Sequence, residues 1–133
     1  MPSRPAPANS SVKLTSSATT SLTGAAGEAL AANWLLKQGL RILERNFRVK
    51  GGEIDLICRD GDTVVFVEVR VRSSEDFGGA AASITPSKQR RLILAARHWL
   101  QRHGECACRF DAVLIAGPMQ DRITWLRAAF SAD

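Results

Sequence analysis

Hydrophobic and polar residues follow two different periods along the chain, and together they predict two helices and five strands. Apolar positions recur at helical spacing in two segments, and Gly39 and Gly104 stand where these helices would end. Thr85 is a suitable N-cap for the second helix, with Pro86 at its first position. The predicted helices cover residues 25–38 and 86–102, and the predicted strands cover residues 40–50, 53–59, 63–72, 110–116 and 123–126. This order, αβββαββ, predicts an α/β fold with one mixed sheet flanked by helices.

The strand predicted over residues 63–72 alternates strictly, which separates its two faces. One face would carry four valines, and the other would change from apolar to charged at Glu68. On the preceding strand, alternation would place Asp55 on the same face as Glu53 and Ile57. The two strands would form a hairpin, because an Asp-Gly-Asp sequence between them is a strong turn signal.

Two registers of this hairpin are open. A two-residue loop at Asp60-Gly61 would set Glu53 opposite Glu68, whereas a four-residue loop would set Asp55 opposite Glu68. Both registers keep Asp55 and Glu68 on one face, because only a slip of one residue exchanges the faces. Two carboxylates on an apolar sheet repel each other, and a divalent cation such as Mg²⁺ or Mn²⁺ would relieve the repulsion. The alternative is an ordinary solvated face on which both acids pair with neighbouring arginines.

Length and composition are typical of one soluble domain, since 45% of the 133 residues are hydrophobic and 23% are charged. Residues 1–23 hold Arg4 and Lys13 but no acid, and their composition predicts a disordered tail before a domain at 24–133. No apolar run approaches the about 20 residues of a membrane-spanning helix. Three cysteines are too few for a disulfide framework, which favours a reducing compartment, the cytoplasm. The net charge of +5 permits binding to nucleic acid without requiring it.

Several short motifs stand in a fixed order between residues 24 and 130. They are Gly27-Glu28, Gly52-Glu53-Ile54-Asp55-Leu56-Ile57, Phe66-Val67-Glu68-Val69-Arg70-Val71-Arg72, Phe77-Gly78-Gly79, Lys88, Arg109-Phe110-Asp111 and Ala129-Phe130. This set resembles the YraN-like uncharacterised protein family, which is placed in the restriction-endonuclease-like superfamily. The resemblance implies a restriction-endonuclease-like core, similar to that of Holliday-junction resolvases, and a metal-dependent nuclease acting on structured or branched nucleic acid, chiefly DNA.

The resemblance also implies roles for individual residues. The superfamily carries an Asp followed by a (D/E)xK motif on the next strand, which Asp55 and Glu68-Val69-Arg70 match, with Arg in place of Lys. Asp55, Glu68 and the carbonyl of Val69 would then hold Mg²⁺ or Mn²⁺, and the metal would activate a water. Glu28 matches an acidic residue on the first helix that would orient or deprotonate this water. Near a helix N-terminus, Glu28 could equally be an ordinary solubilising residue.

Arg70 leaves a second function open, because a guanidinium stays charged and cannot accept a proton. The alternative is a non-catalytic nucleic-acid-binding module with a nuclease-like fold, and a protein–protein adaptor is a third reading. Lys88, Arg72 and Arg91 are the candidate nucleic-acid-binding residues, although a merely solvated basic face would show the same pattern. A homodimer would suit a substrate of two strands. The chain carries no phosphate-binding loop, dinucleotide fingerprint or nucleophile elbow.

Overall fold

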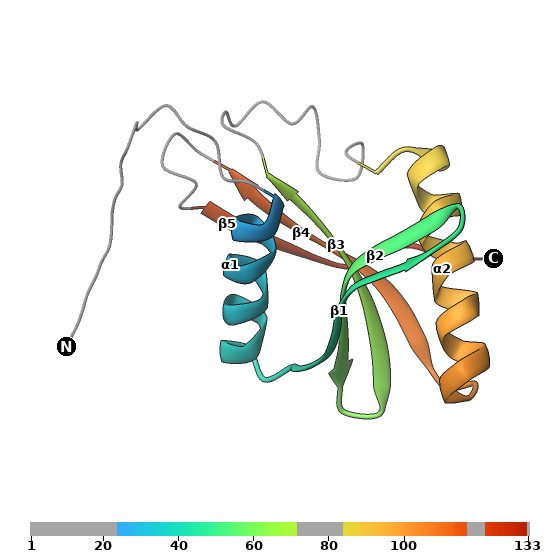
Figure 1. Cartoon of the computed structure of the whole chain (residues 1–133). Coiled ribbons are helices and arrows are strands. Elements are labelled where there is room, and N and C mark those ends of the chain that lie inside the picture. The colour runs from blue at the N-terminus through green and yellow to red at the C-terminus, as the bar shows by residue number, and fades with distance from the viewer. Residues whose placement is uncertain (1–23, 72–83, 117–121, 133) are drawn as a thin grey trace.

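The computed structural model describes residues 24–71, 84–116 and 122–132, which form two helices and five strands (Figure 1). In chain order these are α1 (Gly24–Lys37), β1 (Arg41–Val49), β2 (Gly52–Asp60), β3 (Thr63–Val71), α2 (Pro86–His103), β4 (Cys108–Ala116) and β5 (Arg122–Phe130). The tail predicted at 1–23, the Phe77-Gly78-Gly79 motif and Arg72 lie outside the described residues. Neither of the described helices is both long and apolar enough to span a membrane.

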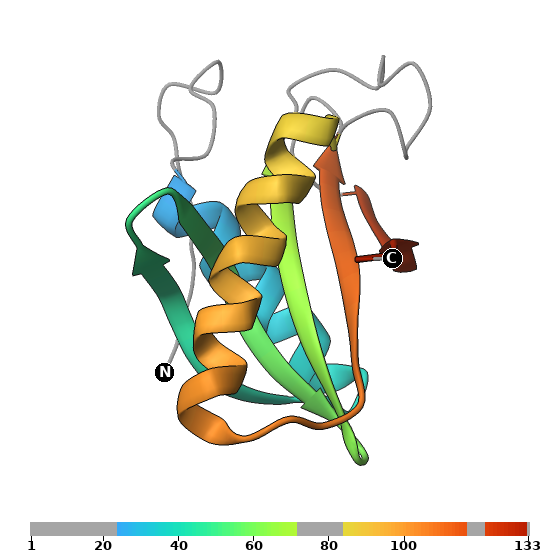
Figure 2. The same cartoon turned by 90° about the vertical axis from the view of Figure 1, so that its right-hand side faces the viewer.

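All five strands form one mixed sheet in the order β1-β2-β3-β4-β5. The pairs β1–β2, β2–β3 and β4–β5 are antiparallel, whereas β3 and β4 are parallel. A parallel pair needs a long crossover, and α2 supplies it. The two helices lie on opposite faces of the sheet, as the two views in Figures 1 and 2 show. The sheet is therefore the middle layer of a three-layer fold.

Each face of the sheet contributes to its own buried cluster, and β3 belongs to both. Val65 and Val67 pack with Leu35 of α1 in the α1-side cluster, and the partly buried valines that follow them along β3 join the same side. Phe66 packs with Trp99 of α2 in the α2-side cluster, where the two rings meet edge to face with centroids 5.9 Å apart. The two faces predicted for this strand from alternation are confirmed.

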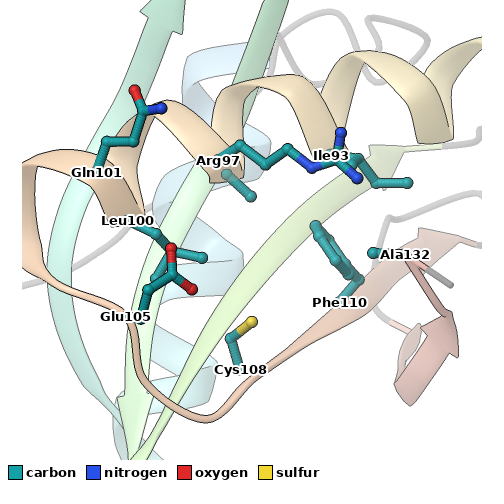
Figure 3. Close-up of a pocket in the computed structure, with 9 residues that line it drawn as sticks. Ile93, Arg97, Leu100, Gln101, Glu105, Cys108, Phe110 and Ala132 are labelled. Carbon is teal, nitrogen blue, oxygen red and sulfur yellow. The ribbon is translucent and has the colours of Figure 1, made fainter.

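The ends of α2 are set by the residues that the sequence pattern indicates. The side chain of Thr85 accepts a hydrogen bond from the backbone N–H of Lys88 at 3.2 Å, as an N-cap does. Gly104 has a φ of 98°, and its N–H donates to the carbonyl of Leu100 at 2.7 Å. A positive φ of this kind favours glycine, so the helix stops there. Beside this helix a pocket of about 370 Å³ opens toward β4 (Figure 3).

β5 is longer than the strand predicted at 123–126. The prediction ended early because a bulge interrupts the alternation of β5. Between the pairs Phe110–Phe130 and Ala112–Leu126, three residues of β5 lie opposite one residue of β4. Ala128 lies in this bulge with a φ of 50°. A bulge of this kind leaves no period-two pattern in the sequence, which explains why the strand was predicted too short.

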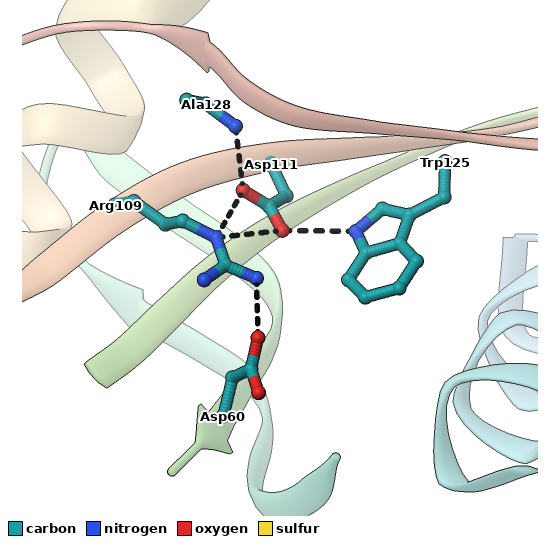
Figure 4. A network of polar contacts seen from close by, with 5 residues as sticks. All are labelled: Asp60, Arg109, Asp111, Trp125 and Ala128. Carbon is teal, nitrogen blue, oxygen red and sulfur yellow. Dashed lines mark hydrogen bonds and ion pairs between the residues drawn. The ribbon is translucent and has the colours of Figure 1, made fainter. Parts of the chain in front are cut away.

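A fully buried carboxylate holds the bulge in place (Figure 4). Asp111 accepts a hydrogen bond from the N–H of Ala128 at 2.9 Å and another from the indole N–H of Trp125 at 2.9 Å. The Nε of Arg109 donates to both carboxylate oxygens at 3.0 and 3.2 Å, and its Nη2 donates to Asp60 at 2.9 Å. The Arg109-Phe110-Asp111 motif therefore stabilises the fold by joining β4, β5 and the end of β2.

Candidate active site

The β2–β3 hairpin has the register that the longer of the two predicted loops required. The pairing ends with Leu56 opposite Val67, in the register in which the next regular pair would be Asp55 and Glu68. The turn is shorter than the predicted four-residue loop, because Asp60 at the end of β2 still pairs with Thr63 of β3. The alternative register, which sets Glu53 opposite Glu68, is wrong.

Regular alternation fails around Asp55. Ile54 and Ile57 are three residues apart, yet both belong to the α2-side cluster, whereas Leu56 belongs to the α1-side cluster. The β2–β3 pairing ends at Leu56, and beyond it the N–H of Val69 donates to Oδ2 of Asp55 at 2.8 Å. The simple alternation predicted from Glu53 to Ile57 is therefore wrong. At this point the N–H of Val69 in β3 is bound by the side chain of Asp55 and not by a backbone carbonyl of β2.

A pocket of about 250 Å³ gathers the predicted catalytic and metal-binding residues. Its walls come from the start of α1, the hairpin strands and the start of α2, three regions that lie toward one end of the molecule in Figure 1. The residues that line it are Gly24, Glu28, Glu53, Asp55, Glu68, Val69, Arg70, Val71 and Lys88. The fold thus brings together side chains that are far apart in the sequence.

Glu68 is buried next to two cations. Its Oε2 lies 3.5 Å from Nζ of Lys88 and 3.6 Å from Nη1 of Arg70, while only 11% of its side chain is exposed. Burial raises the pKa of Glu68 to about 7, and the charge of Asp55 adds to this effect. The two cations act in the opposite direction but do not cancel the rise.

Asp55 lies between two other acids. Burial raises its pKa to about 6, and the hydrogen bond from Val69 only partly offsets this rise. The charge of Glu28 raises the pKa of Asp55 further. Two neighbouring acids with raised pKa values are typical of sites that bind cations or transfer protons.

Arg70 carries an unsatisfied donor at the same place. Its side chain is 17% exposed, and its Nε is buried without a hydrogen-bond partner. An unpaired buried donor costs about 1–3 kcal/mol.

The donor set fits a hard divalent cation. Asp55 and Glu68 offer carboxylate oxygens, and Val69 lines the same pocket. Among the described residues, no three His, Cys, Asp or Glu side chains are grouped as a metal site. Mg²⁺ usually takes only one or two carboxylates and completes its shell with water and phosphate oxygens. Two carboxylates are therefore enough for this ion and too few for a closed structural site.

The predicted nucleic-acid-binding residues lie next to this pocket where the structure describes them. Lys88 lines it, and it also lines a small neighbouring pocket together with Arg91. Glu53 lines both pockets and was not among the predicted site residues. Its position directly after a glycine, which repeats the Gly27-Glu28 pair, is the signal that sequence reasoning left unused.

Gly27 and Gly52 each allow a helix to approach the sheet closely. A Cβ at Gly27 would lie 2.6 Å from Cγ2 of Val71, and a Cβ at Gly52 would lie 2.5 Å from the carbonyl oxygen of Arg91. Glycine therefore lets α1 contact β3 and lets β2 contact α2. This close packing brings the acid after each glycine, Glu28 or Glu53, to the pocket wall.

A family model and individual relatives of known sequence both place this chain in the same family. A sequence model described as uncharacterised protein family UPF0102 matches residues 27–115, a range that includes every pocket residue except Gly24. A UPF0102 protein of Dechloromonas aromatica is 57% identical over 115 residues, which covers 86% of this chain and 93% of the relative. A UPF0102 protein of Nitrosomonas europaea is 59% identical over 108 residues, covering 80% and 92%. One of Herminiimonas arsenicoxydans is 53% identical over 112 residues, covering 84% and 88%.

Proposed function

This chain belongs to the uncharacterised protein family UPF0102, the YraN-like family, and we propose that it is a metal-dependent nuclease that hydrolyses phosphodiester bonds in structured or branched nucleic acid. The observation that carries the proposal is the pocket in which Asp55 and Glu68, two acids with raised pKa values, lie beside Arg70 and Lys88. Acids and cations in one cleft are the groups that phosphoryl chemistry needs.

The proposal includes a restriction-endonuclease-like core. Three features support it: an antiparallel hairpin that carries the acids, a helical crossover, and a parallel pair formed by β3 and β4. The acids lie where the hairpin pairing ends, so the substrate would approach the end of the sheet between the two helices.

In this mechanism five of the pocket residues have roles. Asp55, Glu68 and the carbonyl of Val69 would hold Mg²⁺ or Mn²⁺. Such an ion, when bound, polarises a phosphate and lowers the pKa of a water. Arg70, which lines the pocket, would donate guanidinium N–H groups to a phosphate oxygen, and it holds charge without accepting protons. Glu28 would orient the attacking water or accept its proton.

A non-catalytic nucleic-acid-binding module is the second candidate, and one observation favours it. Lys88 and Arg70 already place two positive charges within 3.6 Å of Glu68 Oε2, so part of the negative charge of this acid is balanced without a metal ion. Under this alternative, nucleic acid binds with an affinity that falls with salt, and divalent ions change nothing.

Cleavage of branched and linear DNA with Mn²⁺ tests the nuclease proposal. Asp55→Asn and Glu68→Gln keep side-chain shape and are expected to lower the cleavage rate at least about 100-fold. Asp62→Asn is the matched control, because Asp62 is exposed in the turn of the same hairpin. Activity that survives both pocket substitutions would refute the site. Calorimetry separates the two candidates, since DNA binding without any heat on Mn²⁺ addition favours the non-catalytic module.

A further inference from the structure

The outer face of α2 is basic over the length of the helix. Its 18 residues contain Lys88, Arg90, Arg91, Arg97 and Arg102 but no Asp or Glu. The four arginines are exposed, whereas the opposite side of the helix is buried against the sheet. In Figure 2, α2 lies at the front of the molecule.

The exposed arginines stand in two rows. Successive residues are about 100° apart around a helix, so Leu94 and Gln101 form a ridge along the middle of the outer face. Arg90 and Arg97 lie on one side of this ridge, and Arg91 and Arg102 lie on the other. Along the helix axis, Arg90 and Arg97 are about 10 Å apart, and Arg91 and Arg102 are about 16 Å apart.

Side-chain contacts at the helix flanks agree with this division. Arg97 lines the pocket toward β4 (Figure 3). The guanidinium of Arg102 lies 5.5 Å from the ring centroid of Phe47 in β1, on the other flank. The two rows therefore overhang opposite sides of the helix, about one helix diameter, or about 10 Å, apart.

We propose that the outer face of α2 binds a nucleic-acid duplex, with one row of arginines on each of the two phosphate backbones that border a groove. The major groove of B-DNA is about 12 Å wide and admits a helix, and guanidinium groups bind phosphates through paired hydrogen bonds. The ridge between the rows suits base edges, because Gln bonds to adenine and an apolar side chain contacts the thymine methyl group. Leu94, on this ridge, is 38% exposed.

This inference deepens the proposed function and relies on it for the position of the cleaved bond. Lys88, in the first turn of α2, lies 3.5 Å from Glu68, so the basic face begins at the rim of the acidic pocket. A duplex held along α2 would therefore direct a backbone phosphate to Asp55 and Glu68. The binding surface itself needs no metal ion.

The test measures binding to a 20-base-pair DNA duplex in EDTA, by fluorescence anisotropy, across a salt series. Arg90→Gln, Arg91→Gln and Arg97→Gln are combined in one variant. The slope of log affinity against log salt is expected to fall by about 2.7, because each phosphate contact contributes about 0.9. The matched control removes three charges elsewhere, through Lys37→Gln, Arg41→Gln and Arg45→Gln, and is expected to change the slope by less than about 0.9. Thermal unfolding by circular dichroism verifies that both variants are folded.

Each other result contradicts a stated part of the proposal. An equal loss in both variants would show general electrostatic attraction and overturn the assignment to α2. A single strand that binds as tightly as the duplex would overturn the two-backbone geometry. Polyglutamate that binds wild type with the same dependence on these arginines would assign the face to acidic proteins instead.

Asp55→Asn, measured alongside, separates this inference from the nuclease proposal. If wild type cleaves and Asp55→Asn does not, while the α2 variant binds like wild type, the inference fails and the nuclease proposal stands. If no DNA is cleaved under any condition but the salt slope falls as expected, the nuclease proposal fails and the duplex-binding face stands.

Discussion

Asp111 and Asp55 are both carboxylates of the sheet, but their hydrogen-bond partners give them opposite roles. Asp111 is surrounded by donors from Arg109, Trp125 and Ala128, so its oxygens are satisfied. Asp55 receives one hydrogen bond, from Val69, and faces two further acids. A buried acid whose oxygens all accept hydrogen bonds fits a structural role, whereas an acid whose neighbours oppose its ionisation is a candidate for a functional site.

Asp55→Asn is expected to raise the free energy of unfolding at pH 8 by on the order of 1 kcal/mol and to leave it unchanged below pH 4. The pKa of Asp55 is about 6 in the folded chain against an ordinary value of 3.8, so ionisation destabilises the folded state. This penalty is absent below about pH 4, grows as pH rises through the folded pKa, and is complete above about pH 7. Urea unfolding at both pH values measures it, with Asp62→Asn as control. A gain confined to pH 4 would contradict the raised pKa.

Asp111→Asn is expected to lower the free energy of unfolding by about 3–5 kcal/mol, since it leaves a buried part of the Arg109 charge without its partner. The amide also offers only one acceptor oxygen to a site where three groups donate. Urea denaturation measures the change. The exposed Asp62→Asn should stay within about 0.5 kcal/mol of wild type, and a similarly small effect at Asp111 would show that the network is dispensable.

At the scale of the elements, local signals predict most of the fold, and long-range side-chain contacts explain the rest. The ends of α2 and the two faces of β3 follow from capping residues and alternation, which are local. The bulge at Ala128 depends on Asp111, and the break at Asp55 depends on Val69, which is 14 residues away. Neither partner can be recognised from the neighbouring residues, so both irregularities escaped sequence reasoning.

The candidate site was predictable in its composition but not in its shape. Alternation along the hairpin predicted that Asp55 and Glu68 share a face, and only the family resemblance added Glu28. The structure places all three in one pocket. The pocket forms because Gly27 and Gly52 let the helices approach the sheet, and this packing is visible only in three dimensions.

Gly52→Ala is expected to lower the free energy of unfolding by about 1–3 kcal/mol, because it overpacks the contact between β2 and α2. The new Cβ would lie 2.5 Å from the carbonyl oxygen of Arg91 and 3.1 Å from the backbone nitrogen of Ala95. Backbone atoms cannot rotate away, so α2 must shift. Gly24→Ala is the control, since nothing lies within 4 Å of its added Cβ. Urea denaturation compares the two, and equal stabilities would show that α2 adjusts without strain.

At the scale of the whole molecule, the pocket exists only when both helices are packed on the sheet. Glu28 comes from the helix on one face and Lys88 from the helix on the other, while Asp55 and Glu68 come from the sheet between them. An unfolded chain holds none of these groups together. Any ligand of the pocket must therefore bind the folded state and stabilise it.

Mn²⁺ is accordingly expected to raise the melting temperature at pH 8, by an amount equivalent to about 2.7 kcal/mol at one hundred times its dissociation constant. The effect should nearly vanish at pH 5, because the pKa values of Asp55 and Glu68, about 6 and about 7, leave both acids mainly protonated there. Thermal unfolding with and without Mn²⁺ measures both conditions. Asp55→Asn should abolish the stabilisation, and Asp62→Asn should retain it. Equal stabilisation of all three proteins would place the ion elsewhere on the chain and remove the physical basis of the nuclease proposal.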